Sequence, residues 1–192
     1  DPDASLYWLG RMLAAGEDPL FIARRMVRMA AEDVGNADPN ALVIAVSAMQ
    51  AFQLIGQPEG ELILAQAAVY LATAPKSNAL YAAYGSVQET VSQTGSLPVP
   101  LHIRNAPTRL MRDLGYGRDY KYAHDYDDAF VFQDYLPEAL RGARFYTPTD
   151  RGYEKIIKDR LTKWQKNGAQ QASGVDKPSH NGEDHAKRER NK

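Results

Sequence analysis

The sequence predicts an all-α protein, and three observations support this fold class. Two Asp-Pro pairs, Asp18-Pro19 and Asp38-Pro39, match helix starts, because a carboxylate caps the first amide groups and proline tolerates the first helical position. Behind each pair, apolar side chains recur every three or four residues. These two patterns stop at Gly35 and Gly56, and an earlier one that begins at Asp3 stops near Gly16, as expected where helices end.

The same patterns predict five consecutive helices in the first half of the chain. Their starts are expected at Asp3, Asp18, Asp38, Pro58 and Ser77, and their ends near Gly16, Gly35, Gly56, Pro75 and Gly95. Because the connecting loops are short, we expect successive helices to pack as near-antiparallel neighbours. We therefore predict a helical domain over residues 1–95.

The second half of the chain has a different composition. We expect a connector at Leu97–Pro100, a short helix at Pro107–Leu114, a tyrosine- and glycine-rich loop at Tyr116–Tyr122, extended or hairpin pieces at Phe130–Tyr135 and Arg144–Thr147, and a last helix capped by Thr149. This predicts a short, irregular and β-containing C-terminal subdomain over residues 96–166. Residues 167–192 carry almost nothing apolar, so we expect a disordered tail there.

Composition limits the possible partners and compartments. The 192 residues carry a formal net charge of -1, so no overall field favours nucleic acid or a membrane. The absence of cysteine excludes disulfides and thiol chemistry and fits a reducing compartment. The longest uncharged run, residues 39–58, contains several polar amides, so we predict a buried helix there and no membrane span. Since the sequence opens at Asp1 without methionine, we expect a piece of a longer protein.

The segment from residue 39 to residue 88 is almost without charge. It contains three charged side chains, Glu59, Glu61 and Lys76. A helix that is apolar all round must be covered on all sides, and a domain of this size offers few such places. Two interpretations stay open, a central core helix and a subunit interface. The interface candidates are the large apolar side chains of the first two helices in this segment, Leu42, Ile44, Val46, Met49, Phe52, Ile63 and Val69.

Motifs for catalysis are missing from the sequence. It has neither a GxxxxGK[ST] phosphate loop nor a GxSxG hydrolase elbow, so we assign no catalytic, cofactor or metal residue. His102, Asp113, His124 and Asp125 are the residues that most resemble an acid–base or metal set. A small hydrolase that uses His102 or His124 with Asp125 is one alternative, although we favour structural roles for these residues.

Basic side chains surround the tyrosine-rich loop and suggest another alternative. They are Arg104, Arg109, Arg112, Arg118 and Lys121, next to Tyr116, Tyr120 and Tyr122. Arginine among aromatic rings is typical of surfaces that bind single-stranded nucleic acid. The acidic residues 125, 127 and 128 lie close by in sequence and argue against an open basic groove. A nucleic-acid-binding module is therefore the second hypothesis.

Several sequence blocks resemble one known family of ATPases. The blocks are Tyr7–Leu9, Gly16–Arg25, Ala31–Gly35, Ala74–Asn78, Pro98–Thr108, Leu114–Gly117, Tyr122–Asp125, Tyr135–Pro137 and Phe145–Pro148. From Leu6 to about Leu161, the chain resembles the segment that follows the ATPase core in replication-associated recombination AAA+ ATPases, the RarA or MgsA family, whose eukaryotic relative is the Werner-helicase-interacting protein. It departs from the family at Asp119, where the family often has glycine.

The resemblance implies a function that composition and spacing alone do not. It implies the helical collar of a clamp-loader-like ATPase, which holds the subunits in a homotetramer and has the ATPase module outside this chain. It also implies a cytoplasmic, nucleoid-associated parent protein that works in replication-fork maintenance, recombination and repair, with DNA and single-strand-binding protein as partners. We expect this segment to associate with itself and to contain no cofactor of its own.

Overall fold

The computed structural model describes residues 1–126 and 129–172, and within them all regular structure is helical. The longer helices are α1 (Pro2–Ala14), α2 (Pro19–Met29), α3 (Asn40–Ile55), α4 (Glu61–Thr73), α5 (Ala79–Thr94), α6 (Arg109–Asp113) and α7 (Tyr153–Ala172). A π-helical turn, Ala30–Val34, extends α2, and short 3₁₀ turns lie at Gly35–Ala37, Leu101–Ile103, Ala123–Asp125 and Glu138–Leu140. The predicted all-α class is confirmed.

The helix starts follow from local capping. The Asp18 carboxylate accepts hydrogen bonds from the amides of Leu20 (2.9 Å) and Phe21 (3.1 Å), as the Asp-Pro pair predicts. At the start of α1, the cap is Asp1 instead of the predicted Asp3, which lies inside the first turn. The helix starts earlier because the Asp1 carboxylate accepts hydrogen bonds from the amides of Asp3 (3.0 Å) and Ala4 (3.1 Å), and Pro2 occupies the first helical position.

The predicted β pieces at Phe130–Tyr135 and Arg144–Thr147 are wrong, because neither forms a strand in the described residues. A side chain replaces a strand partner in the first of them. The Gln133 amide accepts a hydrogen bond from the Lys121 backbone N–H (3.3 Å) and donates one to the Lys121 carbonyl (3.0 Å). The backbone N–H and carbonyl of Lys121 are therefore satisfied without a neighbouring β-strand.

The C-terminal helix is longer than expected. Helix α7 continues to Ala172, so residues 167–172, which were expected to be disordered, are helical. The rest of the predicted tail, 173–192, lies outside the described residues.

The chain divides into two compact units. The first contains Asp1–Thr90 together with Phe145–Asp159, and the second contains Val91–Arg144 and Arg160–Lys192. Sequence patterns did not indicate that a segment of about fifteen residues returns to the first unit.

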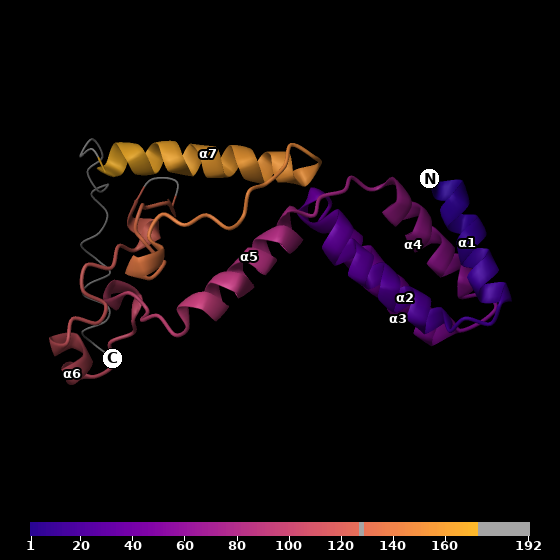
Figure 1. Ribbon diagram of the computed structural model, residues 1–192, viewed down its shortest axis with the longest axis horizontal. Coiled ribbons are helices and arrows are strands. Elements are labelled where there is room, and N and C mark those ends of the chain that lie inside the picture. Colours follow the sequence, from indigo (N-terminus) through magenta and orange to yellow (C-terminus); the bar gives the residue numbers. More distant parts are fainter. Residues whose placement is uncertain (127–128, 173–192) are drawn as a thin grey trace. The chain divides into compact units, whose positions relative to one another are not determined.

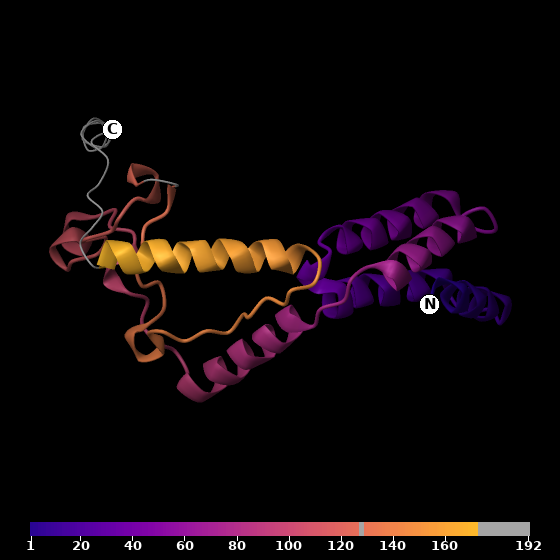
Figure 2. The same ribbon diagram turned by 90° about the horizontal axis from the view of Figure 1, so that it is seen from above.

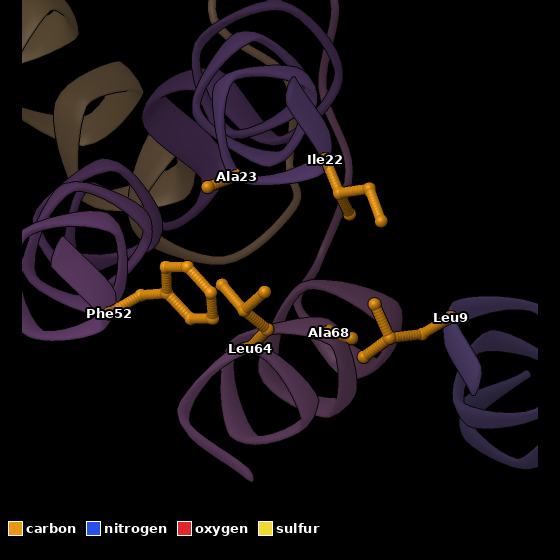
Figure 3. Packing of buried hydrophobic residues seen from close by; sticks show 6 residues of the cluster. All are labelled: Leu9, Ile22, Ala23, Phe52, Leu64 and Ala68. Atoms are coloured by element: carbon orange, nitrogen blue, oxygen red, sulfur yellow. The ribbon is translucent and has the colours of Figure 1, made fainter. Parts of the chain in front are cut away.

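The first unit is built on four packed helices. Helix α1 packs on α4, α2 packs on α3 and α4, and α3 packs on α4 (Figures 1 and 2). One core cluster brings together side chains from all four helices, namely Leu9, Ile22, Ala23, Phe52, Leu64 and Ala68 (Figure 3). A second cluster, Ala30, Val34, Ala41, Ala45 and Leu71, continues along α3 and α4. Alanine predominates inside because small side chains let helix axes approach closely.

Candidate functional site

A buried carboxylate fixes the returning segment to the helices of the first unit. Glu154, in the first turn of α7, is 0% exposed. It accepts hydrogen bonds from the hydroxyls of Ser77 (2.7 Å), Tyr146 (2.9 Å) and Thr149 (2.7 Å), and from the Thr149 backbone N–H (2.8 Å). Four donors satisfy the carboxylate, so its charge is tolerated out of water.

The environment of Glu154 sets its pKa. Burial alone would raise the pKa, but the hydrogen bonds from Thr149, Ser77 and Tyr146 together outweigh burial and lower it. In the same network Asn36 donates to the Tyr146 hydroxyl (3.4 Å), and burial raises the pKa of Tyr146. Glu154 is thus an ionised structural anchor and has the wrong pKa for a general acid at neutral pH.

The lowered pKa predicts how stability depends on pH. Glu154 binds its proton less readily when folded than when unfolded, so its contribution to stability is complete above the ordinary pKa of 4.5 and is lost as pH falls through the folded value. We expect the free energy of unfolding to fall more steeply below about pH 4.5 in the wild type than in Glu154→Gln. Urea denaturation at a series of pH values measures this. Equal slopes would contradict the assigned charge state.

The predicted interface residues lie in different surroundings. Leu42 is 42% exposed, whereas Ile44, Val46, Ile63 and Val69 are half-buried. Met49 is half-buried and packs against the first core cluster. Phe52 is 6% exposed and belongs to that cluster (Figure 3), so its position favours the alternative of a core role.

Three strongly exposed apolar side chains where α3 ends and α4 begins were not among the predicted interface residues. Leu54 is 87% exposed and Ile55 is 56% exposed at the end of α3, and Leu62 is 78% exposed at the start of α4. A sharp turn joins the two helices, so we call these three side chains the α3–α4 corner. Large apolar side chains thus lie on the surface at this corner, although Phe52, Leu64 and Leu71 of the same two helices are buried together with alanines. In the sequence, Leu54 and Ile55 lie in the uncharged run 39–58, whereas Leu62 directly follows Glu61.

Two of the predicted nucleic-acid contacts have structural partners. The Arg104 guanidinium donates to the Val99 carbonyl (2.7 Å) and to the Tyr116 hydroxyl (3.2 Å), and it lies 5.0 Å from the centre of the Tyr116 ring. Arg112 donates to the Ala106 carbonyl (3.2 Å). Arg104 therefore holds the connector against the tyrosine-rich loop, whereas Arg112 joins α6 to the segment just before it.

The other predicted basic contacts are exposed. Arg109 forms an ion pair of 3.9 Å with Asp113, and both side chains are mostly exposed. Arg118 and Lys121 line a cleft of about 690 Å³ in the second unit. The charged side chains around this cleft are Arg104, Arg118, Lys121, Arg141, Asp113, Asp119, Asp134 and Glu138. Positive and negative charges balance there, which does not favour a polyanion.

His102 and His124, the two histidines in the described residues, have different surroundings. His102 lines the same cleft, and its Nε2 atom is buried without a hydrogen-bond partner. His124 is exposed and packs on the Tyr122 ring at 5.1 Å between ring centres. Of the two aspartates in the suggested set, Asp125 lies in the 3₁₀ turn with His124, and Asp113 pairs with Arg109. None of these contacts supports the hydrolase alternative.

Among the described residues, no helix combines the length and apolar character that crossing a membrane requires.

Comparison with known protein families then places the chain. The family described as the MgsA AAA+ ATPase C terminal matches residues 1–165. The chain belongs to this family. The match covers both structural units, including the returning segment with Glu154, and so confirms the resemblance seen in the sequence blocks.

Proteins related to this member of the MgsA C-terminal family come from bacteria and from a eukaryote. The chain is 58% identical to replication-associated recombination protein A of Coxiella burnetii over 86% of its own length and 38% of the relative's. It is 48% identical to the protein of the same name in Escherichia coli K12, over 83% of the chain and 36% of the relative. It is also 48% identical to the ATPase WRNIP1 of Dictyostelium discoideum, over 76% of the chain and 17% of the relative. The chain thus spans well under half the length of these relatives.

Proposed function

We propose that this domain assembles the subunits of a replication-associated recombination AAA+ ATPase into a homotetramer. In that assembly it positions ATPase modules that lie outside this chain, so that nucleotide binding in one subunit affects another. The names of the relatives support the biological setting, which is recombination during DNA replication. We place the parent protein in the cytoplasm with the nucleoid, together with DNA and single-strand-binding protein.

One observation carries the assembly role. Besides its buried core, the first unit exposes large apolar side chains at the α3–α4 corner and on α1, where Tyr7 and Trp8 are each 61% exposed. Apolar surface contributes about 25 cal/mol per Å² when it leaves water. Large exposed apolar surface on a domain with few charges marks a contact with another protein. The simplest partner that could cover this apolar surface is a second copy of the same chain.

Light scattering over a concentration series tests the proposal. We expect a mass near four chains for the wild type. The double variant Leu54→Glu with Leu62→Glu should lower the mass to two chains or one, because two carboxylates would be buried unpaired in each contact. The matched control, Gln53→Glu with Gln66→Glu, adds the same charge at exposed polar positions of the same helices and should keep the wild-type mass. A wild-type monomer at high concentration would refute the proposal.

A further inference from the structure

A groove in the first unit lies between α1 and α2. Each of these helices packs on α4, but they do not pack extensively on each other. The hollow between them has a volume of about 660 Å³. On its floor, Leu71 is 1% exposed and Ala68 is 8% exposed, and Leu9 and Ile22 extend from α1 and α2 toward Ala68 (Figure 3). The floor therefore belongs to the buried core, and the space above it is open to a partner.

The walls of this α1–α2 groove are mostly apolar. Three of the five methionines of the chain, Met12, Met26 and Met29, line it. Trp8 lines it as well and is 61% exposed. Methionine side chains are flexible and polarisable, so they adapt to apolar groups of different shapes, and an open apolar surface of this kind fits a protein partner. The charged lining residues are Asp1, Arg25 and Asp33.

Two of these charged side chains lie on one stripe of the α2 segment and its π-helical extension. Arg25, Met29 and Asp33 follow each other at intervals of four residues, and all three line the groove. Arg25 and Asp33 are exposed, and neither forms an ion pair in the part of the chain that the structure describes. Asp33 lies within electrostatic range of Arg28, but the Arg28 guanidinium pairs with Glu32 at 2.7 Å. At a rise of about 1.5 Å per residue, Arg25 and Asp33 are about 12 Å apart, beyond the screening length of about 8 Å at physiological salt, so they stabilise each other little within one chain.

The order of these charges is self-complementary. Met29 lies midway between Arg25 and Asp33, four residues from each. When a second copy of the segment runs antiparallel about a two-fold axis at Met29, Arg25 of each copy faces Asp33 of the other, and the two Met29 side chains meet at the axis. A parallel arrangement would instead place arginine against arginine and aspartate against aspartate, which is unfavourable.

We propose that the α1–α2 groove is a two-fold contact with a second copy of this chain, centred on Met29 and held in register by two Arg25–Asp33 pairs. This inference rests on the proposed homotetramer and names one of its contacts. A two-fold contact requires that residue i meets residue j while residue j meets residue i, and the stripe of Arg25, Met29 and Asp33 meets this requirement. Exposed charge pairs add little affinity, so burial of the apolar walls supplies the stability and the charges supply the register.

The size of the groove indicates its place in the assembly. Fourteen residues of one copy line it, whereas a stable interface uses about 20–30 residues a side. The groove is therefore too small to hold a dimer alone. A tetramer with D2 symmetry has more than one kind of two-fold contact, and the α3–α4 corner consists of other residues. Loss of the groove contact should therefore leave dimers.

Charge reversal tests the pairing. Arg25→Glu places two carboxylates opposite each other at both ends of the contact, and Asp33→Arg places two guanidinium groups there. Each variant should halve the mass measured by light scattering, from four chains to two, because like charges would face each other twice. Circular dichroism should show an unchanged helical content, since both positions are exposed. The control Arg11→Glu makes the same change at an exposed position of α1 that does not line the groove, and should keep four chains.

Combining the two changes separates a contact between copies from an effect within one chain. The double variant Arg25→Glu with Asp33→Arg restores both pairs in reversed order and should return to four chains. An equimolar mixture of the two single variants should also return to four chains. In the mixture, the glutamate introduced at position 25 faces the arginine introduced at position 33, and the unchanged Arg25 faces the unchanged Asp33. This recovery requires that the two positions meet across copies.

The outcomes distinguish this contact from the homotetramer itself. Masses of four chains for both single variants would overturn the groove contact and leave the homotetramer standing. Single variants that fall to two chains without recovery in the mixture would overturn the pairing of Arg25 with Asp33. A wild-type monomer would refute both proposals.

Discussion

Replacing Glu154 by alanine is expected to lower the free energy of unfolding by about 4 kcal/mol. The carboxylate is fully buried and accepts hydrogen bonds from Ser77, Tyr146 and Thr149. Its removal leaves the Ser77 hydroxyl and the Thr149 amide without their acceptor in an interior site. Thermal denaturation followed by circular dichroism should show a melting temperature lower by roughly 10 °C or more.

The loss of stability in Glu154→Ala should begin in the segment that Glu154 holds. Glu154 joins the loop after α4, the segment before α7 and the start of α7, so its loss should release Phe145–Asp159 from the first unit. Hydrogen exchange of amides in this segment should therefore accelerate more than exchange in α3. Glu59→Ala removes an exposed glutamate and should change stability by less than about 0.5 kcal/mol. A Glu154→Ala variant as stable as this control would show that the network has no structural role.

Local rules in the sequence were enough to predict the helices of the first unit. The Asp18-Pro19 pair gave the start of α2 because capping needs only residues within one turn. The second Asp-Pro pair placed α3 correctly, and Asp38 accepts hydrogen bonds from the Asn40 amide (3.1 Å) and from the more distant Tyr70 hydroxyl (2.6 Å). The near absence of charge across α3 and α4 also identified these two helices as the part of the chain that forms either a core or a subunit interface.

The inward faces of α3 and α4 could not be predicted in the same way. Sequence reasoning finds the buried face of a helix by contrast with a polar face, and these helices have almost no polar face. Phe52 therefore looked like an interface residue although it lies in the core, and Leu54 passed unnoticed although it is 87% exposed. Alanine at 41 and 45 decided the orientation, since only small side chains let α3 approach its neighbours.

Long-range polar contacts were also beyond local rules. Glu154 looked like one of several charged residues on an amphipathic helix, and its partner Ser77 is 77 positions away in the sequence. The Gln133 amide that replaces a strand partner belongs to the same class, because its partner Lys121 lies across a loop. Neither pairing has a spacing that a single sequence reveals.

Leu64→Ala should lower the free energy of unfolding by about 3–4 kcal/mol. Leu64 is 0% exposed and lies between Phe52 and the side chains of α1 and α2 in the first core cluster (Figure 3). Its neighbour Ala68 has no side chain that could move into the cavity, so the loss should fall in the upper part of the range for leucine. Urea denaturation at one low protein concentration measures the change.

Leu62→Ala is the matched control, two residues earlier on the same helix. Leu62 is 78% exposed, so its truncation should cost the single chain less than about 0.5 kcal/mol. Assembly stabilises the folded chain by mass action, so the melting temperature of the wild type should rise with protein concentration. In Leu62→Ala this rise should be smaller, and we expect no other large effect of the substitution. The two leucines of α4 would then have different roles: Leu64 would stabilise the fold, and Leu62 would stabilise the assembly. A concentration-independent loss at Leu62 equal to that at Leu64 would contradict this division.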